Sequence, residues 1–250
     1  MSNKTDKYAI TPLETDKQNI PQKQSSKKGI CARFPFSWVI SGRSGSGKTQ
    51  LLLNVFTRDD LLGSYFHMIL IFSPTAGTLD DTYKGLKLPK ENYIKEFDRS
   101  TLETILQNRK TLIMDKGIEW VAKNNRVCLI FDDMIAEKSF MNSPETLKMF
   151  TLLRHYLCSV VICSQSFKRI PRSIRINANW LCIFPSLQSE VQIMLEEITP
   201  SGITKKEFQK IIDYCTSGRY DFMNINNHAP PKERIRKNLS EIIDIEKFKS

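Results

Sequence analysis

The stretch Gly42-Arg43-Ser44-Gly45-Ser46-Gly47-Lys48-Thr49 decides the fold of this chain, because it fits G-x-x-x-x-G-K-[ST] at every fixed position. The run before it, residues 36–40, is apolar and typical of a buried strand, and residues 50–56 have the pattern of the first turns of a helix. A glycine-rich turn that matches by chance is the alternative, but it would not need these flanks. The sequence therefore predicts a P-loop that binds a nucleoside triphosphate.

The chemistry of a P-loop explains why these residue types are needed. The glycines let the backbone N–H groups of residues 42–49 surround a phosphate chain, and the start of the helix adds its positive dipole end. We expect Lys48 to reach the β- and γ-phosphates and the Thr49 hydroxyl to take one position on Mg²⁺. ATP and Mg²⁺ are therefore the expected ligands.

Composition limits the remaining possibilities. The 250 residues fit one α/β domain with some additions. The 37 Lys and Arg residues exceed the 27 Asp and Glu residues, which gives a formal charge of +10 and favours a polyanionic partner. Nucleic acid is the leading candidate; an acidic protein or a membrane surface stays open.

The cysteines and histidines indicate neither disulfides nor a zinc site. Six cysteines contain no C-x-x-C pair, and three scattered histidines form no metal spacing with them. No apolar segment approaches the roughly 20 residues that span a bilayer, and the N-terminus is polar. We expect a soluble protein, not secreted and without a membrane partner, in a reducing compartment.

The order of apolar and helical segments predicts an α/β fold. Residues 1–29 are polar and indicate a flexible arm, residues 30–225 an ATPase domain, and residues 226–250 a basic extension. Further strands are expected at 65–72, 127–131, 159–163 and 180–184, with 220–225 as an edge strand. Helices are expected at 97–108, 144–157 and from 186 to 214, while 111–114 stays unassigned. Such apolar strands between helices favour a RecA-like, mostly parallel sheet with helices on both faces.

Two acidic residues, Asp132 and Asp133, directly follow the apolar run 127–131 and look like a Walker B motif. In a parallel sheet they would emerge at the same edge as Lys48. Asp132 is then the expected Mg²⁺ partner, and Asp133 the base that polarises the attacking water. A solvated acidic turn is the alternative, and the P-loop upstream counts against it.

Polar and basic residues follow the next strand. Gln165 is the candidate sensor of the γ-phosphate, with an ordinary capping role as the alternative. Lys168, Arg169, Arg172 and Arg175 fall within eight residues of each other. One of these residues, or Arg154 before the strand, is a candidate arginine finger toward a neighbouring subunit, and the others are candidate DNA contacts. A surface role remains open for each.

The combined pattern resembles the genome-packaging ATPases of large DNA viruses and virophages, the poxvirus-type branch of the FtsK–HerA superfamily. The resemblance covers roughly residues 34–225 and rests on the order of the motifs, Arg154-His155 before the Gln165 strand, and the element at residues 170–179. It implies a ring-forming homo-oligomer that hydrolyses ATP and drives double-stranded DNA into a viral capsid. It also implies the host cytoplasm or viral factory as the location, with association with the virion left open.

The resemblance implies a role for each matching residue. Lys48 and Thr49 would bind phosphate and Mg²⁺, Asp132 and Asp133 would serve the metal and the water, and Gln165 would be the sensor glutamine. Arg154 matches the region where a trans-acting arginine is expected. Asp133 departs from the pattern, since much of the superfamily has Glu there. We also expect a departure in size, with no room for the large membrane or DNA-orienting domains of FtsK, and no nuclease domain like that of terminases is visible in the sequence.

Three other functions use the same P-loop. A cellular-type DNA helicase or pump would share the motor core. A small-molecule kinase would be expected to show an arginine-rich lid, whereas paired acids and a sensor Gln favour water as the acceptor. A nucleotide switch would hydrolyse slowly and ignore DNA.

Overall fold

The computed structural model describes residues 25–26, 30–74, 81–96, 99–134 and 144–249. The strands are β1 (Ser37–Ser41), β2 (Met68–Phe72), β3 (Tyr93–Ile94), β4 (Val127–Asp132), β5 (Cys158–Ser164), β6 (Trp180–Ile183), β7 (Met223–Asn226), β8 (Ile235–Lys237) and β9 (Glu241–Ile242). The α-helices are α1 (Lys48–Thr57), α2 (Arg99–Lys116), α3 (Ile118–Asn124), α5 (Pro144–Leu153), α6 (Arg172–Asn177), α7 (Gln188–Glu197) and α8 (Lys205–Cys215). The 3₁₀ turns are η1 (Asp81–Leu86), η2 (Lys90–Asn92), η4 (Pro231–Glu233) and η5 (Ile245–Phe248).

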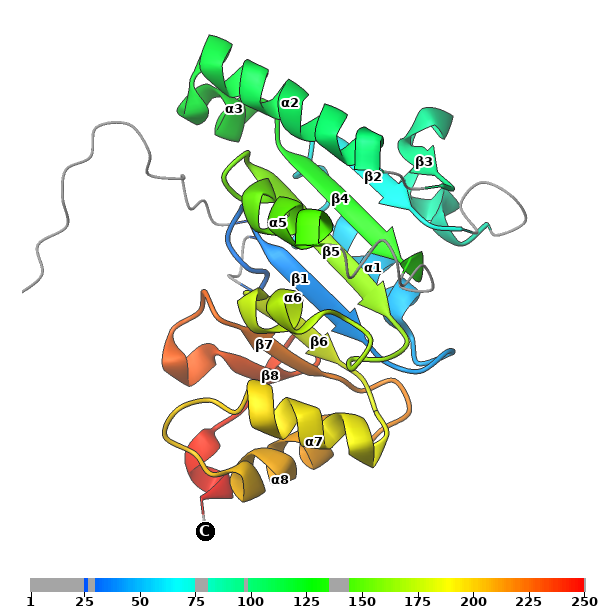
Figure 1. Ribbon diagram of the computed structural model, residues 1–250. Coiled ribbons are helices and arrows are strands. Elements are labelled where there is room, and N and C mark those ends of the chain that lie inside the picture. The colour runs from blue at the N-terminus through cyan, green and yellow to red at the C-terminus, as the bar shows by residue number, and fades with distance from the viewer. Residues whose placement is uncertain (1–24, 27–29, 75–80, 97–98, 135–143, 250) are drawn as a thin grey trace, which may run out of the picture.

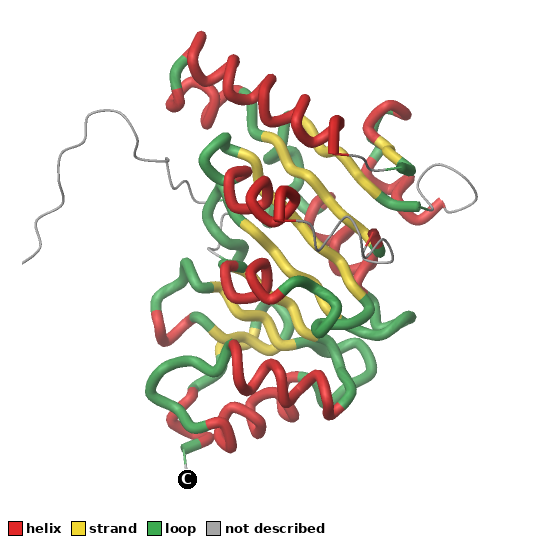
Figure 2. The backbone as a smooth tube through the Cα atoms, in the orientation of Figure 1, coloured by secondary structure: helices red, strands yellow, loops and turns green. Residues whose placement is uncertain are grey.

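The nine strands that the structure describes form one sheet in the order β3-β2-β4-β5-β1-β6-β7-β8-β9 (Figure 2). The pairs from β3 to β6 are parallel, and the pairs from β6 to β9 are antiparallel. The prediction of a mostly parallel α/β sheet is therefore confirmed. The order places β5 between β1, which leads into the P-loop, and β4, which ends in the acidic pair.

Alternating side chains divide the core between the two faces of the sheet. On β1, Val39 belongs to a core cluster that includes residues of α2, α5, α6, α7 and α8, whereas Trp38 and Ile40 belong to a second cluster with residues of α1, η1 and the segment 30–36. Figure 1 shows α5 and α6 in front of the central strands and α1 behind them. The expected helices on both faces are therefore present, and the central strands are buried on both sides.

Two expected boundaries are corrected by the structure. The second strand begins at Met68 rather than at residue 65, because Tyr65 and Phe66 pack instead against Phe34 in a side cluster. The unassigned residues 111–114 belong to α2, which runs to Lys116. The helix is longer than predicted because its partly exposed apolar residues also contact this side cluster.

The segment 220–225 is not an edge strand. Its strand, β7, pairs with β6 on one side and β8 on the other, and its residues are buried. The sheet therefore continues past residue 225 through β8 and β9, while the proposed division of the chain at that point stays a prediction. Most of the expected arm at residues 1–29 lies outside the described residues.

The cysteines lie in the core of the protein. All six thiols are buried, and in the described part of the chain none forms a disulfide. Burial raises the pKa of Cys158 to about 11 and that of Cys31 to about 12.

The helices that the structure describes lack the combination of length and apolar content needed to cross a bilayer.

Candidate nucleotide-binding site

The P-loop leaves the carboxyl end of β1 in very close contact with the neighbouring strands. The Gly42 N–H donates to the Ser164 carbonyl of β5 at 3.1 Å. On its other side, a Cβ built at Gly42 would lie 2.5 Å from Phe184 Cβ, closer than two carbon atoms can approach. Gly42 is therefore required because the chain passes between two packed strands.

The loop then turns sharply into α1. Gly47 has a φ of 101°, which favours glycine, and α1 begins at the next residue, Lys48. The Lys48 side chain is 8% exposed and donates from Nζ to the carbonyl oxygens of Gly42 at 2.7 Å and Arg43 at 3.1 Å. Its ammonium group is thus held inside the loop, where a phosphate would lie.

The acidic pair lies at the same edge of the sheet. Asp132 is the last residue of β4 and pairs in register with Cys163 of β5, while Ser41 of β1 pairs with Ser164. Asp133 follows with a φ of 52°, and its N–H donates to the Cys163 carbonyl at 3.2 Å. The three adjacent strand ends therefore bring the acids and the P-loop together, as expected.

Gln165 contacts the second residue of the acidic pair. It follows β5 directly, and its side-chain Nε2 donates to Asp133 Oδ2 at 2.8 Å. The backbone beyond Gln165 is fixed by Glu190 of α7, whose carboxylate accepts from the Ser166 hydroxyl and from the Phe167 N–H at 3.3 Å. The predicted sensor and the predicted base are thus in direct contact.

Tyr83 is a site residue that the sequence analysis missed. It lies on η1, is 4% exposed, and its hydroxyl donates to Asp132 Oδ2. Burial and the Asp132 carboxylate both raise the pKa of Tyr83, so the phenol stays protonated and remains a donor. The two partners are 49 positions apart in the sequence, and no motif links them; the packing of η1 near α1 brings them together.

The residues present fit a bound Mg²⁺ ion. Thr49 lies in the first turn of α1, and Asp132 provides a carboxylate at the same edge. The buried Ser46 Oγ has no hydrogen-bond partner among the described residues. No three His, Cys, Asp or Glu side chains gather in the described part of the chain, but Mg²⁺ beside phosphates needs only one or two carboxylates.

Arg175 occupies a different place from the one expected. Its side chain is 8% exposed and forms two 2.7 Å hydrogen bonds with the Glu197 carboxylate. It also donates to the carbonyl oxygens of Phe167, Lys168 and Ile170, at 3.3, 2.9 and 2.5 Å. All three guanidinium nitrogens are engaged within the chain, so the contacts favour a structural role over the predicted catalytic one.

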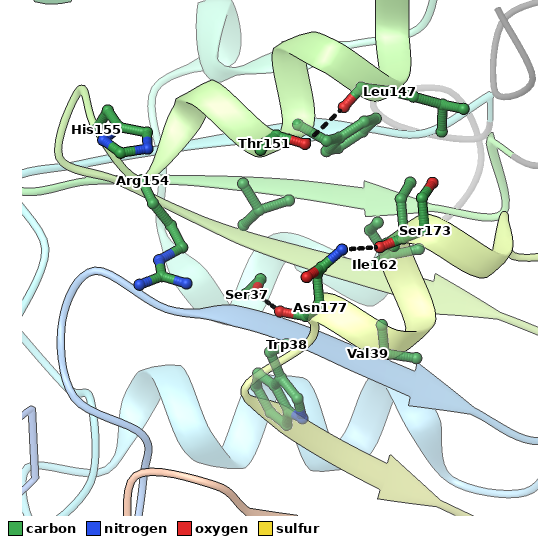
Figure 3. Close-up of a pocket in the computed structure, with 13 residues that line it drawn as sticks. Ser37, Trp38, Val39, Leu147, Thr151, Arg154, His155, Ile162, Ser173 and Asn177 are labelled. Atoms are coloured by element: carbon green, nitrogen blue, oxygen red, sulfur yellow. Dashed lines mark hydrogen bonds between the residues drawn. The ribbon is translucent and has the colours of Figure 1, made fainter. Parts of the chain in front are cut away.

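Arg154 lies far from the P-loop of its own chain. It precedes β5, at the amino ends of the parallel strands, and lines a cavity of about 170 Å³ together with Ser37, the first residue of β1. Figure 3 shows both residues, with Trp38 and Asn177, around this cavity. The structure therefore does not bring Arg154 together with Lys48, Asp133 or Gln165.

The other predicted cations are at the site's edge. Lys168 and Arg169 are exposed on the loop that follows Gln165, and Arg172 is exposed at the start of α6. Only a long contact of 3.5 Å joins Arg172 to Glu197. The loop that Arg175 and Glu190 fix therefore presents positive charge to solvent close to Gln165.

Comparison of the sequence with those of known proteins shows the family of this chain. The sequence profile described as "Poxvirus A32 protein" matches residues 23–227. The DNA packaging protein OPG160 of vaccinia virus (strain Copenhagen) is 30% identical over 203 residues, covering 79% of this chain and 70% of that protein. The protein of the same name from monkeypox virus is also 30% identical over 203 residues, covering 79% and 63%.

Solved structures share the fold. The sulfate complex of the genome packaging NTPase B204 from Sulfolobus turreted icosahedral virus 2 superposes with a TM-score of 0.56 at 16% identity, covering 84% of this chain and 98% of that one. The DNA-packaging ATPase B204 from Sulfolobus turreted icosahedral virus gives a TM-score of 0.54 at 15% identity, with the same coverage.

Proposed function

Because this chain belongs to the poxvirus A32 protein family, we propose that it is an ATP-hydrolysing motor that moves double-stranded DNA into a viral capsid. One observation carries the proposal: the carboxyl ends of three adjacent strands bring together the P-loop with Lys48, the metal ligand Asp132 and the contacting pair Asp133–Gln165. This arrangement supports hydrolysis, because it supplies a phosphate cradle, a metal ligand and a base at one edge.

Each residue has a role in the proposed reaction. The N–H groups of residues 42–49 and the Lys48 ammonium bind the phosphates and compensate charge that develops on them. Thr49 and Asp132 hold Mg²⁺, which neutralises phosphate charge when bound, and Tyr83 fixes the Asp132 carboxylate. Asp133 accepts a proton from the attacking water, while Gln165 keeps that carboxylate in place through its amide N–H.

Assembly completes the proposed motor. Arg154 lies at the amino ends of the parallel strands, whereas the P-loop lies at their carboxyl ends. It is therefore proposed to act on the nucleotide of a neighbouring subunit in a ring of identical chains. Lys168, Arg169 and Arg172 are proposed to contact DNA phosphates. Their loop follows Gln165 directly, so a change at the nucleotide has a short path to the DNA-facing side chains.

The test is steady-state ATP hydrolysis with and without linear double-stranded DNA at low salt. The blank is Lys48→Ala, expected to lose ~10²-fold or more of the turnover, and the control is Lys110→Ala, an exposed change on α2. DNA is expected to stimulate hydrolysis. Light scattering on the same sample gives the oligomeric mass, and slow hydrolysis that ignores DNA in a confirmed oligomer would contradict the motor and favour a switch or kinase.

A further inference from the structure

A second cavity, of about 680 Å³, opens beside the last glycine of the P-loop. Its walls come from α1, from Phe184 after β6, and from residues 220–222 and 238–240 on either side of β7 and β8. In the strand order β4-β5-β1-β6-β7, this cavity lies on one side of β1 and the acidic pair with Gln165 lies on the other. Its volume is that of a small-ligand pocket.

Aromatic rings form the wall nearest the P-loop. A Cβ built at Gly47 would lie 3.5 Å from Tyr220 Cδ1 and 3.7 Å from Phe184 Cε1, so both rings reach the loop backbone. Phe184 and Phe222 are buried with ring centroids 5.0 Å apart. Tyr220, in contrast, is 59% exposed, an unusual state for a large ring that touches a P-loop glycine.

Polar side chains also line the cavity. Gln50 and Asn54 lie one turn apart on α1, where Asn54 Nδ2 donates to the Gln50 carbonyl at 2.8 Å. The far end holds Arg58 and Asp60, joined by hydrogen bonds of 3.0 and 2.9 Å. A ligand in this cavity would therefore meet both aromatic rings and side-chain amide groups.

The polarity of the triphosphate fixes which part of the nucleotide enters. The γ-phosphate must point toward Asp132 and Asp133, because the metal ligand and the base act there. With the β-phosphate in the P-loop, the nucleoside must then leave on the other side of β1, along the first turns of α1 and past Gly47. This path leads into the cavity.

We propose that this cavity binds the nucleoside and that Tyr220 stacks on the base. The Arg219 guanidinium lies over the Tyr220 ring at 5.1 Å from its centroid and covers one face, which leaves the other face for the base. The inference rests on the nucleotide-binding part of the proposed function and not on DNA translocation.

The test compares two probes that share the P-loop contacts but differ in the nucleoside. Calorimetric titration of the full chain with ADP and with inorganic pyrophosphate separates base binding from phosphate binding. Tyr220→Ala is expected to raise the Kd for ADP roughly tenfold or more, and to leave the Kd for pyrophosphate within about twofold. Tyr220→Phe, which keeps the ring, and Trp120→Ala, which removes a 44% exposed ring on α3, are expected to bind both probes like the wild type.

Three results would overturn the inference. An unchanged Kd for ADP in Tyr220→Ala would remove the base contact, and an equal loss for both probes would mean that the ring merely supports the P-loop. Wild-type protein that binds neither probe would overturn both the cavity assignment and the proposed function. Normal ADP binding without DNA-stimulated hydrolysis would contradict the motor alone.

Discussion

Asp133 has a left-handed backbone conformation, with a φ of 52°, directly after a strand. Such a conformation is uncommon outside glycine, but Asp and Asn tolerate it. The turn takes the side chain out of the strand direction, where Gln165 contacts it. The shorter acid at this position is thus combined with a backbone turn and an amide partner that together set where its carboxylate lies.

Asp133→Asn is expected to bind ATP and fail to hydrolyse it. Asparagine suits the same φ, so the fold is retained, but its amide cannot accept the proton from water, and turnover should fall by ~10²-fold or more. Nucleotide binding by filter retention and single-turnover hydrolysis separate the two effects. Asp115→Asn, an exposed change on α2, serves as the control, and normal turnover of Asp133→Asn would exclude this residue as the base.

Sequence reasoning at this scale succeeded where partners are close in the chain or marked by a strand end. Lys48 belongs to a contiguous motif, and Asp132 and Gln165 each follow an apolar run, so a parallel sheet brings them to one edge. Tyr83 was missed because its contact with Asp132 depends on how η1 packs. The contact of Arg175 with Glu197 was not foreseen because Glu197 lies 22 residues away on another helix, and the catalytic role of Arg175 stays a prediction.

At the scale of elements, Arg175 joins α6, α7 and the loop that follows Gln165. Its side chain and that of Glu197 are 8% and 10% exposed, whereas Arg172, which also approaches Glu197, is 70% exposed. Removing one partner of a buried pair leaves the other charge uncompensated, but an exposed pair contributes little.

Arg175→Ala is therefore expected to lower the free energy of unfolding by about 3–5 kcal/mol. Arg172→Ala, the matched control on the same helix, should cost less than about 1 kcal/mol. Urea unfolding followed by circular dichroism measures both changes. Similar small losses in the two variants would mean that the pair does not stabilise the fold, and would return Arg175 to the list of candidate fingers.

His228 joins the turn after β7 to the segment before β1. Its Nδ1 accepts a hydrogen bond from the Arg33 N–H at 3.0 Å, which requires a ring nitrogen without a proton. Burial, followed by the positive charges of Arg154 and Arg33, lowers the pKa of His228 from 6.5. His228 thus binds a proton less readily in the folded state than in the unfolded state. Acid therefore shifts the equilibrium at this residue toward the unfolded state.

The contribution of His228 to the free energy of unfolding is expected to be fully present above pH 6.5, the pKa of histidine in the unfolded chain. It should fall as the pH drops below 6.5 and level off below the lower pKa that His228 has in the folded state. His228→Asn offers an acceptor oxygen that does not titrate, so its unfolding free energy should fall less between pH 7.5 and pH 5.5. Chemical unfolding at both pH values measures the difference. Equal losses in the two proteins would show that His228 contributes nothing to the acid sensitivity.

The element boundaries show where local patterns stop being informative. The buried central strands are apolar runs that stand out in any window, and four of the five were predicted to within one residue at each end, the fifth to within three. β8 and β9 were missed because strands of three and two residues carry no alternation of their own. They are strands because β7 offers a partner, which also makes β7 an interior strand.

For the whole molecule, the positive charge on the loop after Gln165 is the expected contact with DNA. Lys168, Arg169 and Arg172 are exposed together there, while Lys110, Lys116 and Lys123 are exposed on α2 and α3, with the same total charge. Two triple alanine variants therefore differ only in where three charges are removed. If net charge alone determined DNA binding, the two variants would bind DNA equally well. If DNA binds at a local interface, their affinities for DNA would differ.

Replacing Lys168, Arg169 and Arg172 is expected to weaken DNA binding and to reduce the slope of log K against log salt by up to about 3, one for each lost phosphate contact. The α2–α3 variant should keep the wild-type slope. Fluorescence anisotropy with labelled double-stranded DNA over a series of salt concentrations measures both. An unchanged slope in the first variant would move the contacts elsewhere, to residues 1–29 or 232–237.

The two edges of the sheet, β3 and β9, are only two residues long each. Long exposed edges let proteins join strand to strand and aggregate, and very short ones prevent it. Within the part of the chain that the structure describes, copies of this protein therefore offer one another no long backbone edge for strand pairing. Between the described parts of neighbouring copies, we therefore expect contacts made by side chains of folded subunits, so that single substitutions on the surface separate an oligomer into folded monomers.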